Sequence, residues 1–200
     1  IPWDSNSINW DDFDAVIIRS TWDYQQKENL FSRTLQLIEA SSATLYNSLD
    51  TVKWNINKRY LLELEKENIS IIPTRLYDSF DFEIVSRLFS FFNENKLVIK
   101  PCVSANADDT FILEHSKMEN LKSVLEGTFS RKDFLVQPFI KSIKSEGEYS
   151  LIYFGNRLSH VLLKTPKNGD FRVQEEQGGF LKAINKPKSS LVDFGNKVMG

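Results

Sequence analysis

The sequence predicts an α/β protein built from α+β subdomains, and two features predict it. Short apolar runs alternate along the chain with longer segments that have a helical period. Toward the C-terminal end, two β-rich runs flank Gly155-Asn156, a dipeptide suited to a tight hairpin turn. The 200 residues include 41% hydrophobic residues and fifteen phenylalanines, which is ample core material for one large domain or two to three small ones.

The first elements follow from their apolar spacing. The run DAVIIRS at 14–20 predicts a strand, and residues 44–47 predict a short extended piece. Between them, residues 29–40 predict a helix with four apolar residues on one face, namely Leu30, Phe31, Leu35 and Ile38. A second helix is predicted at 57–68, with Asn57 as N-cap and Asn68 as C-cap.

The remaining elements alternate regularly. Pro73 ends a predicted strand, and Pro138 marks the end of another, because proline cannot donate to a sheet. Strands are predicted at 69–74, 96–101, 109–115 and 133–140. Helices are predicted at 81–95, 116–127 and 189–199, and a hairpin at 148–164. Between this hairpin and the next short element lies the polar loop TPKNGDFRVQEEQGG, residues 165–179. Loops of this length are usually functional or disordered.

Composition excludes several functions. The net charge of −2 gives no basic field for nucleic acid, and no stretch approaches the roughly 18 apolar residues of a membrane span. Cys102 is the single cysteine, so no internal disulfide can form, which fits a reducing compartment. His115 and His160 are isolated, which argues against a zinc site. The first ten residues do not resemble a signal peptide, so we expect a cytoplasmic protein.

Charged residues at strand ends are the candidates for chemistry. Lys100 ends an apolar strand, where it is either a lysine reaching to solvent or a point charge aimed at a phosphate. Lys58 lies near a predicted helix start, where a surface lysine is the commoner reading, yet a lysine at a helix N-terminus also suits an anion. Glu148 starts the hairpin as a solvated residue or as an acceptor for sugar hydroxyls. Arg19, with Trp22 and Asp23, is suited to holding a carboxylate substrate.

The order of five motifs resembles the ATP-grasp superfamily. They are NKRYL, VIKP, VQPFI, GEYSLIYF and KTPKNGDFRVQEEQGG, and together they extend over most of the chain. The pattern is most similar to the branch with glutathione synthetase and the glutamate ligases that modify a ribosomal protein. The runs RSTWDY and KWNINKRYL further resemble a subgroup that includes the ligase forming D-cycloserine.

The resemblance implies roles for these residues. Lys58 and Lys100 match two lysines that contact ATP phosphates, and Glu148 matches an acidic residue near the ribose. The backbone of a hinge is expected to read adenine, and its residues are Val136, Gln137, Pro138, Phe139 and Ile140. Lys164 and Arg172 match catalytic cations of a mobile loop that closes over phosphate and substrate.

Two loops are expected to move. Residues 104–110, which include Ser104, Asn106 and Asp109, match a lid over the phosphates, although relatives often have glycine there and this loop has none. In the loop at 165–179, Gly169 and the pair Gly178-Gly179 allow hinge-like backbone angles. We expect this second loop not to pack when open.

The implied function is an ATP-dependent carboxylate–amine ligase. A carboxylate attacks the γ-phosphate of ATP to give an acyl phosphate, and an amine then displaces phosphate; both substrates are small molecules. Two alternatives stay open, namely an ATP-grasp kinase and a non-catalytic nucleotide-binding module. Relatives are often dimers or tetramers, so a homo-oligomer is also compatible with the resemblance.

The resemblance also predicts that the chain is a fragment, truncated at both ends. The predicted divisions are a partial N-terminal domain at 1–55, an ATP-grasp lid subdomain at 56–140 and a partial second subdomain at 141–200. The family's Mg²⁺ ligands are expected beyond residue 200, with none in this chain, so we expect the fragment to have impaired catalysis.

Overall fold

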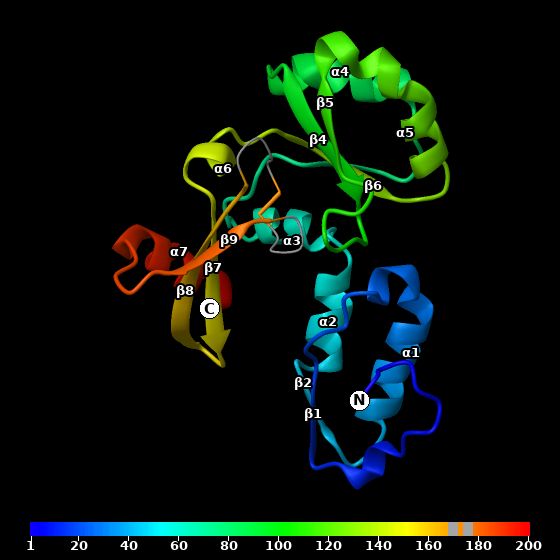
Figure 1. The fold of residues 1–200 in the computed structure, drawn as a ribbon, viewed down its shortest axis with the longest axis vertical. Helices are drawn as coiled ribbons and strands as arrows, with labels where there is room; N and C mark the ends of the chain where they lie inside the picture. Colours follow the sequence, from blue (N-terminus) through cyan, green and yellow to red (C-terminus); the bar gives the residue numbers. More distant parts are fainter. Residues whose placement is uncertain (168–171, 174–177) are drawn as a thin grey trace.

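The computed structural model describes residues 1–167, 172–173 and 178–200. Its described strands form three separate sheets, each accompanied by helices (Figure 1). The strands are β1 (Ala15–Ile17), β2 (Thr44–Tyr46), β3 (Arg75–Tyr77), β4 (Lys96–Pro101), β5 (Phe111–Glu114), β6 (Phe134–Pro138), β7 (Glu148–Phe154), β8 (Arg157–Thr165) and β9 (Phe180–Ala183). The α-helices are α1 (Glu28–Glu39), α2 (Leu49–Ile56), α3 (Tyr60–Lys66), α4 (Phe82–Phe92), α5 (Lys122–Phe129), α6 (Ser142–Ser145) and α7 (Ser189–Met199). Three 3₁₀ helices complete the list, namely η1 (Trp10–Asp12), η2 (Tyr24–Gln26) and η3 (His115–Leu121).

The N-terminal part is a small parallel unit. Strands β1 and β2 pair in parallel from Ala15 opposite Thr44 to Ile17 opposite Tyr46. Helix α1 covers them with a buried stripe of Phe31, Leu35 and Ile38, as its spacing predicts. Leu30 is exposed, contrary to the prediction, because the buried stripe runs through positions 31, 34, 35 and 38 and leaves Leu30 outside it.

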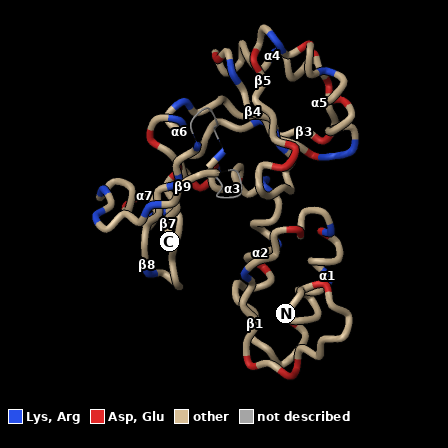
Figure 2. Tube along the Cα trace, in the orientation of Figure 1, with Lys and Arg blue, Asp and Glu red and all other residues tan. Residues whose placement is uncertain are grey.

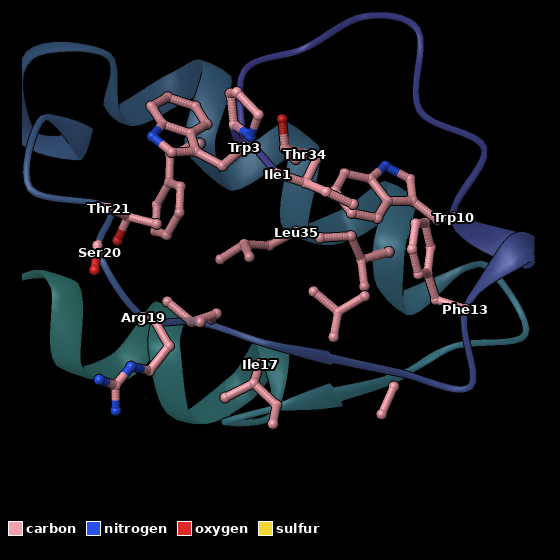
Figure 3. Close-up of a pocket in the computed structure, with 16 residues that line it drawn as sticks. Ile1, Trp3, Trp10, Phe13, Ile17, Arg19, Ser20, Thr21, Thr34 and Leu35 are labelled. Carbon is pink, nitrogen blue, oxygen red and sulfur yellow. The ribbon is translucent and has the colours of Figure 1, made fainter.

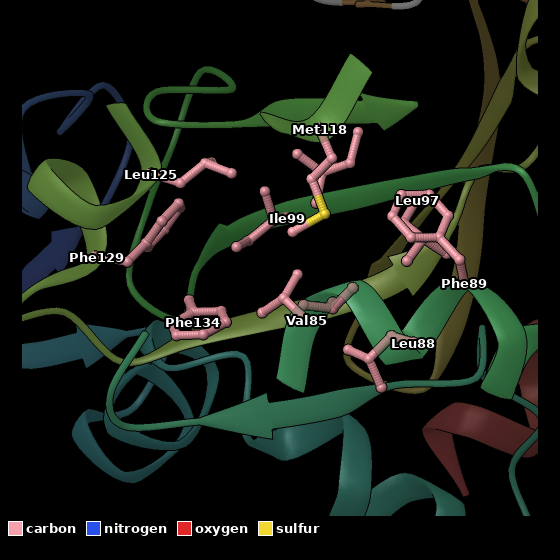
Figure 4. Close-up of a cluster of buried hydrophobic side chains, with 11 residues drawn as sticks. Val85, Leu88, Phe89, Leu97, Ile99, Met118, Leu125, Phe129 and Phe134 are labelled. Atoms are coloured by element: carbon pink, nitrogen blue, oxygen red, sulfur yellow. The ribbon is translucent and has the colours of Figure 1, made fainter. Parts of the chain in front are cut away.

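The central part contains the larger core. Its sheet is antiparallel in the order β3-β6-β4-β5, and α4 and α5 lie along it (Figure 1). Side chains from both helices and from two central strands meet in one cluster, shown in Figure 4. Its fully buried members include Val85, Leu97, Ile99, Phe129 and Phe134. This core fixes β4 and β6, and most of the predicted nucleotide-binding residues lie in these two strands or directly after β6.

Helix α4 shows why its boundaries could be predicted closely. Asp81 is its N-cap, and the carboxylate accepts a hydrogen bond from the Ile84 N–H at 2.9 Å. Asn93 ends the helix in the left-handed conformation with φ 52°, which asparagine tolerates well. The predicted helix at 81–95 is therefore confirmed, with its last turn shortened.

The C-terminal part is an antiparallel sheet. Strands β7 and β8 form the predicted hairpin, and β9 pairs with β8 on its other side. Helix α7 lies against the hairpin, where the Tyr153 hydroxyl donates to Asn196 Oδ1 at 2.9 Å. Gly147 precedes β7 with φ +90°, and a Cβ there would overlap the carbonyl oxygen of Lys164. This close approach sets the position of the neighbouring Glu148.

The segment 49–74 differs most from the prediction. Helix α2, capped by the Ser48 side chain, is an element the sequence analysis missed. The predicted helix at 57–68 is shorter: α3 begins at Tyr60, and the side-chain oxygen of Asn57 accepts from the Arg59 N–H instead of capping a helix that starts at 58. The predicted strand at 69–74 is wrong, because only Arg75–Tyr77 find a partner, in β6.

The three sheets fall within the three predicted ranges, and the division at residues 55 and 140 stays a proposal. Acidic residues are the more frequent in the N-terminal part and basic residues in the C-terminal part, although both signs occur in each (Figure 2). Among the described residues, no helix is both long and apolar enough to span a membrane.

Candidate functional site

One cavity collects most of the predicted nucleotide-binding residues. It measures about 280 Å³ and lies where the end of β4, the end of β6 and the start of β7 meet. Of the predicted cofactor-binding residues, those lining it are Lys58, Lys100, Gln137, Pro138, Phe139, Ile140 and Glu148. Arg172 lines it as well. Residues that are distant in the sequence are thus brought to one place by the fold.

Lys58 lies in the turn between α2 and α3 and holds the lid loop. Its Nζ donates to the carbonyl oxygen of Ser104 at 2.8 Å and contacts Ser104 Oγ at 2.9 Å. Its backbone N–H donates to the Cys102 carbonyl at 2.9 Å, so main chain and side chain bind the same segment. Burial, aided by the like charge of Lys100, lowers the pKa of Lys58 from 10.5 to about 8.

Lys100 is the second cation of the cavity. It is half-buried on β4, and the described residues offer its ammonium no hydrogen-bond or ion-pair partner within the usual distances. Burial lowers its pKa, and the negative charge of Glu148 opposes that shift. Two half-buried lysines facing one cavity disfavour each other's charge, so an anion bound between them would stabilise both.

The opposite wall is apolar, with one buried polar side chain. Gln137 is 5% exposed, and its Nε2 donates to Thr74 Oγ1 at 2.9 Å. The β3–β6 register ends at Arg75 opposite Val136, so in the described structure no strand pairs with the β3 side of β6 beyond that point. Val136 itself is fully buried in the core and does not line the cavity. Its predicted contact with the nucleotide would therefore have to come from its main chain.

Glu148 and Lys164 face each other across the hairpin. They are register partners, with 3.5 Å between Lys164 Nζ and Glu148 Oε1. Glu148 lines the cavity, whereas Lys164 does not. The predicted catalytic Lys164 therefore pairs with Glu148 and does not line the cavity. Of the two predicted catalytic cations, Arg172 is the one at the cavity.

The loop residues divide in the same way. Ser104 and Asn106 line the cavity, whereas Asp109, Gly178 and Gly179 do not. Gly169 lies outside the described residues. Val173, next to Arg172, is 4% exposed and so is packed, contrary to the expectation at this one position; residues 168–171 and 174–177 of the loop lie outside the described residues.

The lid loop adopts glycine-like angles without glycine. Asn106, Ala107 and Asp109 have φ of 54°, 61° and 51°. This region costs L-residues roughly 1–2 kcal/mol each, less for Asn and Asp. The loop thus adopts this backbone conformation without glycine, but at a cost in conformational free energy.

The predicted substrate residues lie elsewhere. A second cavity, of about 480 Å³, is formed by β1, α1 and the N-terminal segment, and Trp3, Trp10 and Leu35 line it (Figure 3). Arg19 lies at its margin with its guanidinium pointing away from these apolar side chains. Trp22 is 60% exposed, and Asp23 accepts from the Trp3 indole N–H at 2.9 Å. None of these three predicted substrate residues lines the cavity of the two lysines.

Several cavity residues were missed by the sequence analysis. Ile72, Val98 and Ile143 supply apolar walls. Alternation along β4 could have indicated Val98, since it shares a strand face with Lys100. Ile72 was assigned to a strand, and Ile143 lies in a short helix without a clear period, so neither carried a usable signal.

Comparisons with known proteins show which proteins this chain resembles. A family model described as D-cycloserine synthetase DcsG, N-terminal domain, matches residues 1–47. The cycloserine biosynthesis protein DcsG of Streptomyces lavendulae is 23% identical over 167 residues, which cover 81% of this chain and 55% of that protein. The chain thus spans about half the length of this curated relative.

Solved structures give the same fold. The crystal structure of D-cycloserine synthetase DcsG superposes with a TM-score of 0.84 at 21% identity, covering 98% of this chain and 67% of that one. An ATP-grasp RimK domain protein from Sphaerobacter thermophilus gives 0.65 at 15% identity, covering 84% and 58%. The chain therefore has the ATP-grasp fold and, within it, resembles the D-cycloserine synthetase subgroup.

Proposed function

We propose that the protein carrying this chain is an ATP-dependent carboxylate–amine ligase, and that the cavity of Lys58 and Lys100 binds the ATP. The observation that carries the proposal is that three cations, an apolar wall and one carboxylate converge on this cavity. Those groups suit a triphosphate, a flat heterocycle and a ribose in turn. The relatives named above support the ligase reading.

The phosphate end is formed by Lys58, Lys100 and Arg172. The ammonium of Lys100 forms no ion pair with a described side chain, and Glu148, whose charge acts on it, already pairs with Lys164, so the ammonium is available to phosphate oxygens. Lys58 holds Ser104 at the base of the lid loop, which places loop amides at the same end. Charge-assisted hydrogen bonds to phosphate are about twice as strong as neutral ones, so this end supplies most of the orientation.

The base and the sugar occupy the other end. Ile72, Val98 and Ile140 form an apolar slot, and the adjacent main chain of 137–140 lacks a β3 partner. Main-chain groups at such an edge can read the hydrogen-bonding edge of adenine. Glu148, at the start of β7, is placed to accept from ribose hydroxyls.

The chemistry requires charge dispersal and exclusion of water. Attack of a carboxylate on the γ-phosphate gives an acyl phosphate and ADP, and attack of the amine on its carbonyl carbon releases phosphate. Lys100 and Arg172 would hold the transferring group, and the lid loop would exclude water, which otherwise hydrolyses an acyl phosphate. The described residues contain no group of three or more His, Cys, Asp or Glu side chains placed to hold a metal ion.

Product analysis tests the reaction type. We expect ADP and inorganic phosphate to appear only when a carboxylate and an amine are both supplied, and hydroxylamine to trap the acyl phosphate as a hydroxamate. A phosphorylated product without free phosphate would identify a kinase instead. ATP binding without any turnover, across a screen of amino acids and other small carboxylates, would identify a non-catalytic module.

Lys58 makes nucleotide affinity depend on pH. Its free-state pKa of about 8 means that the ammonium is lost above pH 8 in the absence of ligand. Bound phosphate favours the charged form, so binding at pH 8–9 takes up protons and affinity falls as the pH rises through 8. The stability of the free protein changes with pH in the opposite direction. Below pH 8 Lys58 is charged in the folded and unfolded states, so burying its charge lowers the free energy of unfolding. Between pH 8 and 10.5 the folded protein has lost this proton, so the free energy of unfolding rises.

Calorimetry measures this coupling. ATP titrations at pH 8.5 in two buffers with different ionisation enthalpies should report proton uptake. Lys58→Arg is the matched control, because arginine stays charged throughout, and its profile should be flatter. An affinity that is constant from pH 7 to 9.5 in the wild type would contradict the role of Lys58.

A further inference from the structure

The lid loop at 104–110 contains a turn that normally selects glycine. The Asp108 N–H donates to the Ala105 carbonyl at 2.9 Å, and both central residues, Asn106 and Ala107, have positive φ. Such turns favour Asn-Gly, because glycine enters this region without a steric cost. Here alanine occupies the glycine position. Something besides local preference must hold the loop in shape.

Two side chains from outside hold consecutive residues of the loop. Gln25 Nε2, from η2 in the N-terminal part, donates to Asp108 Oδ2 at 3.0 Å. Lys132 Nζ, from the segment just before β6, contacts Asp109 Oδ2 at 2.5 Å. Asp108 and Asp109 are thus held from two different parts of the chain; Asp108 follows the two central residues of the turn, and Asp109 itself has positive φ.

Packing does little at this place. A cavity of about 770 Å³ lies beside this contact, and Gln25, Asp108, Asp109 and Lys132 all line it. The Oε1 atom of Gln25 is buried and has no hydrogen-bond partner among the described residues. Rotating the amide would point that oxygen at the Asp108 carboxylate, so the bond to Asp108 fixes the orientation of the amide.

We propose that Gln25 and Lys132 are positioning residues that hold the lid loop in its left-handed conformation over the nucleotide cavity. Their contacts would stabilise the positive φ angles that glycine residues would adopt without a steric cost. The contact of Gln25 also links the N-terminal part to the ATP-binding part. The effect on nucleotide affinity rests on the proposed function, whereas the effect on the loop itself does not.

Gln25→Ala tests the link. Without nucleotide, amide hydrogens at 105–110 should exchange faster than in the wild type, and ATP affinity should fall about fivefold, as expected for the net loss of one solvent-exposed hydrogen bond. Gln26→Ala is the matched control, because Gln26 is adjacent, lines the same cavity and makes no hydrogen bond to the loop among the described residues. It should leave both measurements unchanged.

Ala107→Gly in the Gln25→Ala background separates loop shape from other effects. Glycine removes the steric cost at position 107, so affinity should return toward the wild-type value. The proposal is overturned if Gln25→Ala leaves exchange unchanged, or if the lost affinity is not restored by Ala107→Gly. Should the wild type bind no ATP, the proposed function fails, while the exchange of 105–110 still decides the role of Gln25.

Discussion

Lys100→Ala is expected to weaken ATP binding by roughly 10- to 100-fold, the loss that removal of a charge-assisted hydrogen bond produces. The lysine is half-buried, faces the cavity and lacks a close partner among the described residues, so its loss removes a phosphate contact without breaking an existing one. Stability should change little or rise slightly, because a buried charge is removed. Equilibrium titration with ATP and thermal unfolding measure the two effects.

Lys96→Ala is the matched control for this variant. Lys96 lies four residues earlier on the same strand, and its Nζ binds Glu114 Oε1 at 2.6 Å instead of facing the cavity. The Lys96–Glu114 ion pair is exposed, and such a pair contributes at most about 1 kcal/mol to the free energy of unfolding. Equal losses of ATP affinity in Lys96→Ala and Lys100→Ala would show that general charge, and not the cavity, attracts the nucleotide.

Gly147→Ala is expected to destabilise the C-terminal sheet by roughly 2–5 kcal/mol, combining a left-handed backbone cost with steric overlap. The added Cβ would overlap the Lys164 carbonyl oxygen and approach Thr165 Cγ2 at 2.9 Å. The start of β7 must then move, and Glu148 moves with it, so ATP affinity should fall together with stability. Chemical denaturation and ATP titration test both.

Gly155→Ala separates the two causes. Gly155 also has positive φ, 56°, but a Cβ there meets nothing within 4 Å. It should therefore cost only about 1 kcal/mol and leave ATP affinity unchanged. If both alanine variants lose equal stability, the close approach at Gly147 is not what fixes the hairpin.

The sequence predicted the core elements well where local and tertiary preferences agree. The capped helix α4, the apolar strand β4 and the Gly155-Asn156 hairpin each carry their own signal. Helix α2 did carry a signal that the sequence analysis missed, because Leu49, Val52 and Ile56 have helical spacing and Ser48 is a favoured N-cap, but the helix is only eight residues long and includes the β-branched Thr51 and Val52. The strand expected at 69–74 does not form, because pairing with β6 begins only at Arg75. Tertiary contacts set this register, so the local sequence did not indicate it.

The site was predictable only in part. Resemblance located Lys58, Lys100 and Glu148, and the structure places all three around one cavity. It could not indicate that Lys164 would pair with Glu148, because that depends on the hairpin register. Nor could it give the contact between Gln25 and Asp108, which joins residues 83 positions apart.

Hydrogen exchange with and without ATP tests the central claim most directly, because it reports where the nucleotide binds. The cavity assignment predicts protection at 98–110 and at 136–148, which contain Lys100, the lid loop and the hinge, and no protection around the N-terminal cavity at residues 1–38. Protection confined to the N-terminal cavity, or none at either place at saturating ATP, would contradict it.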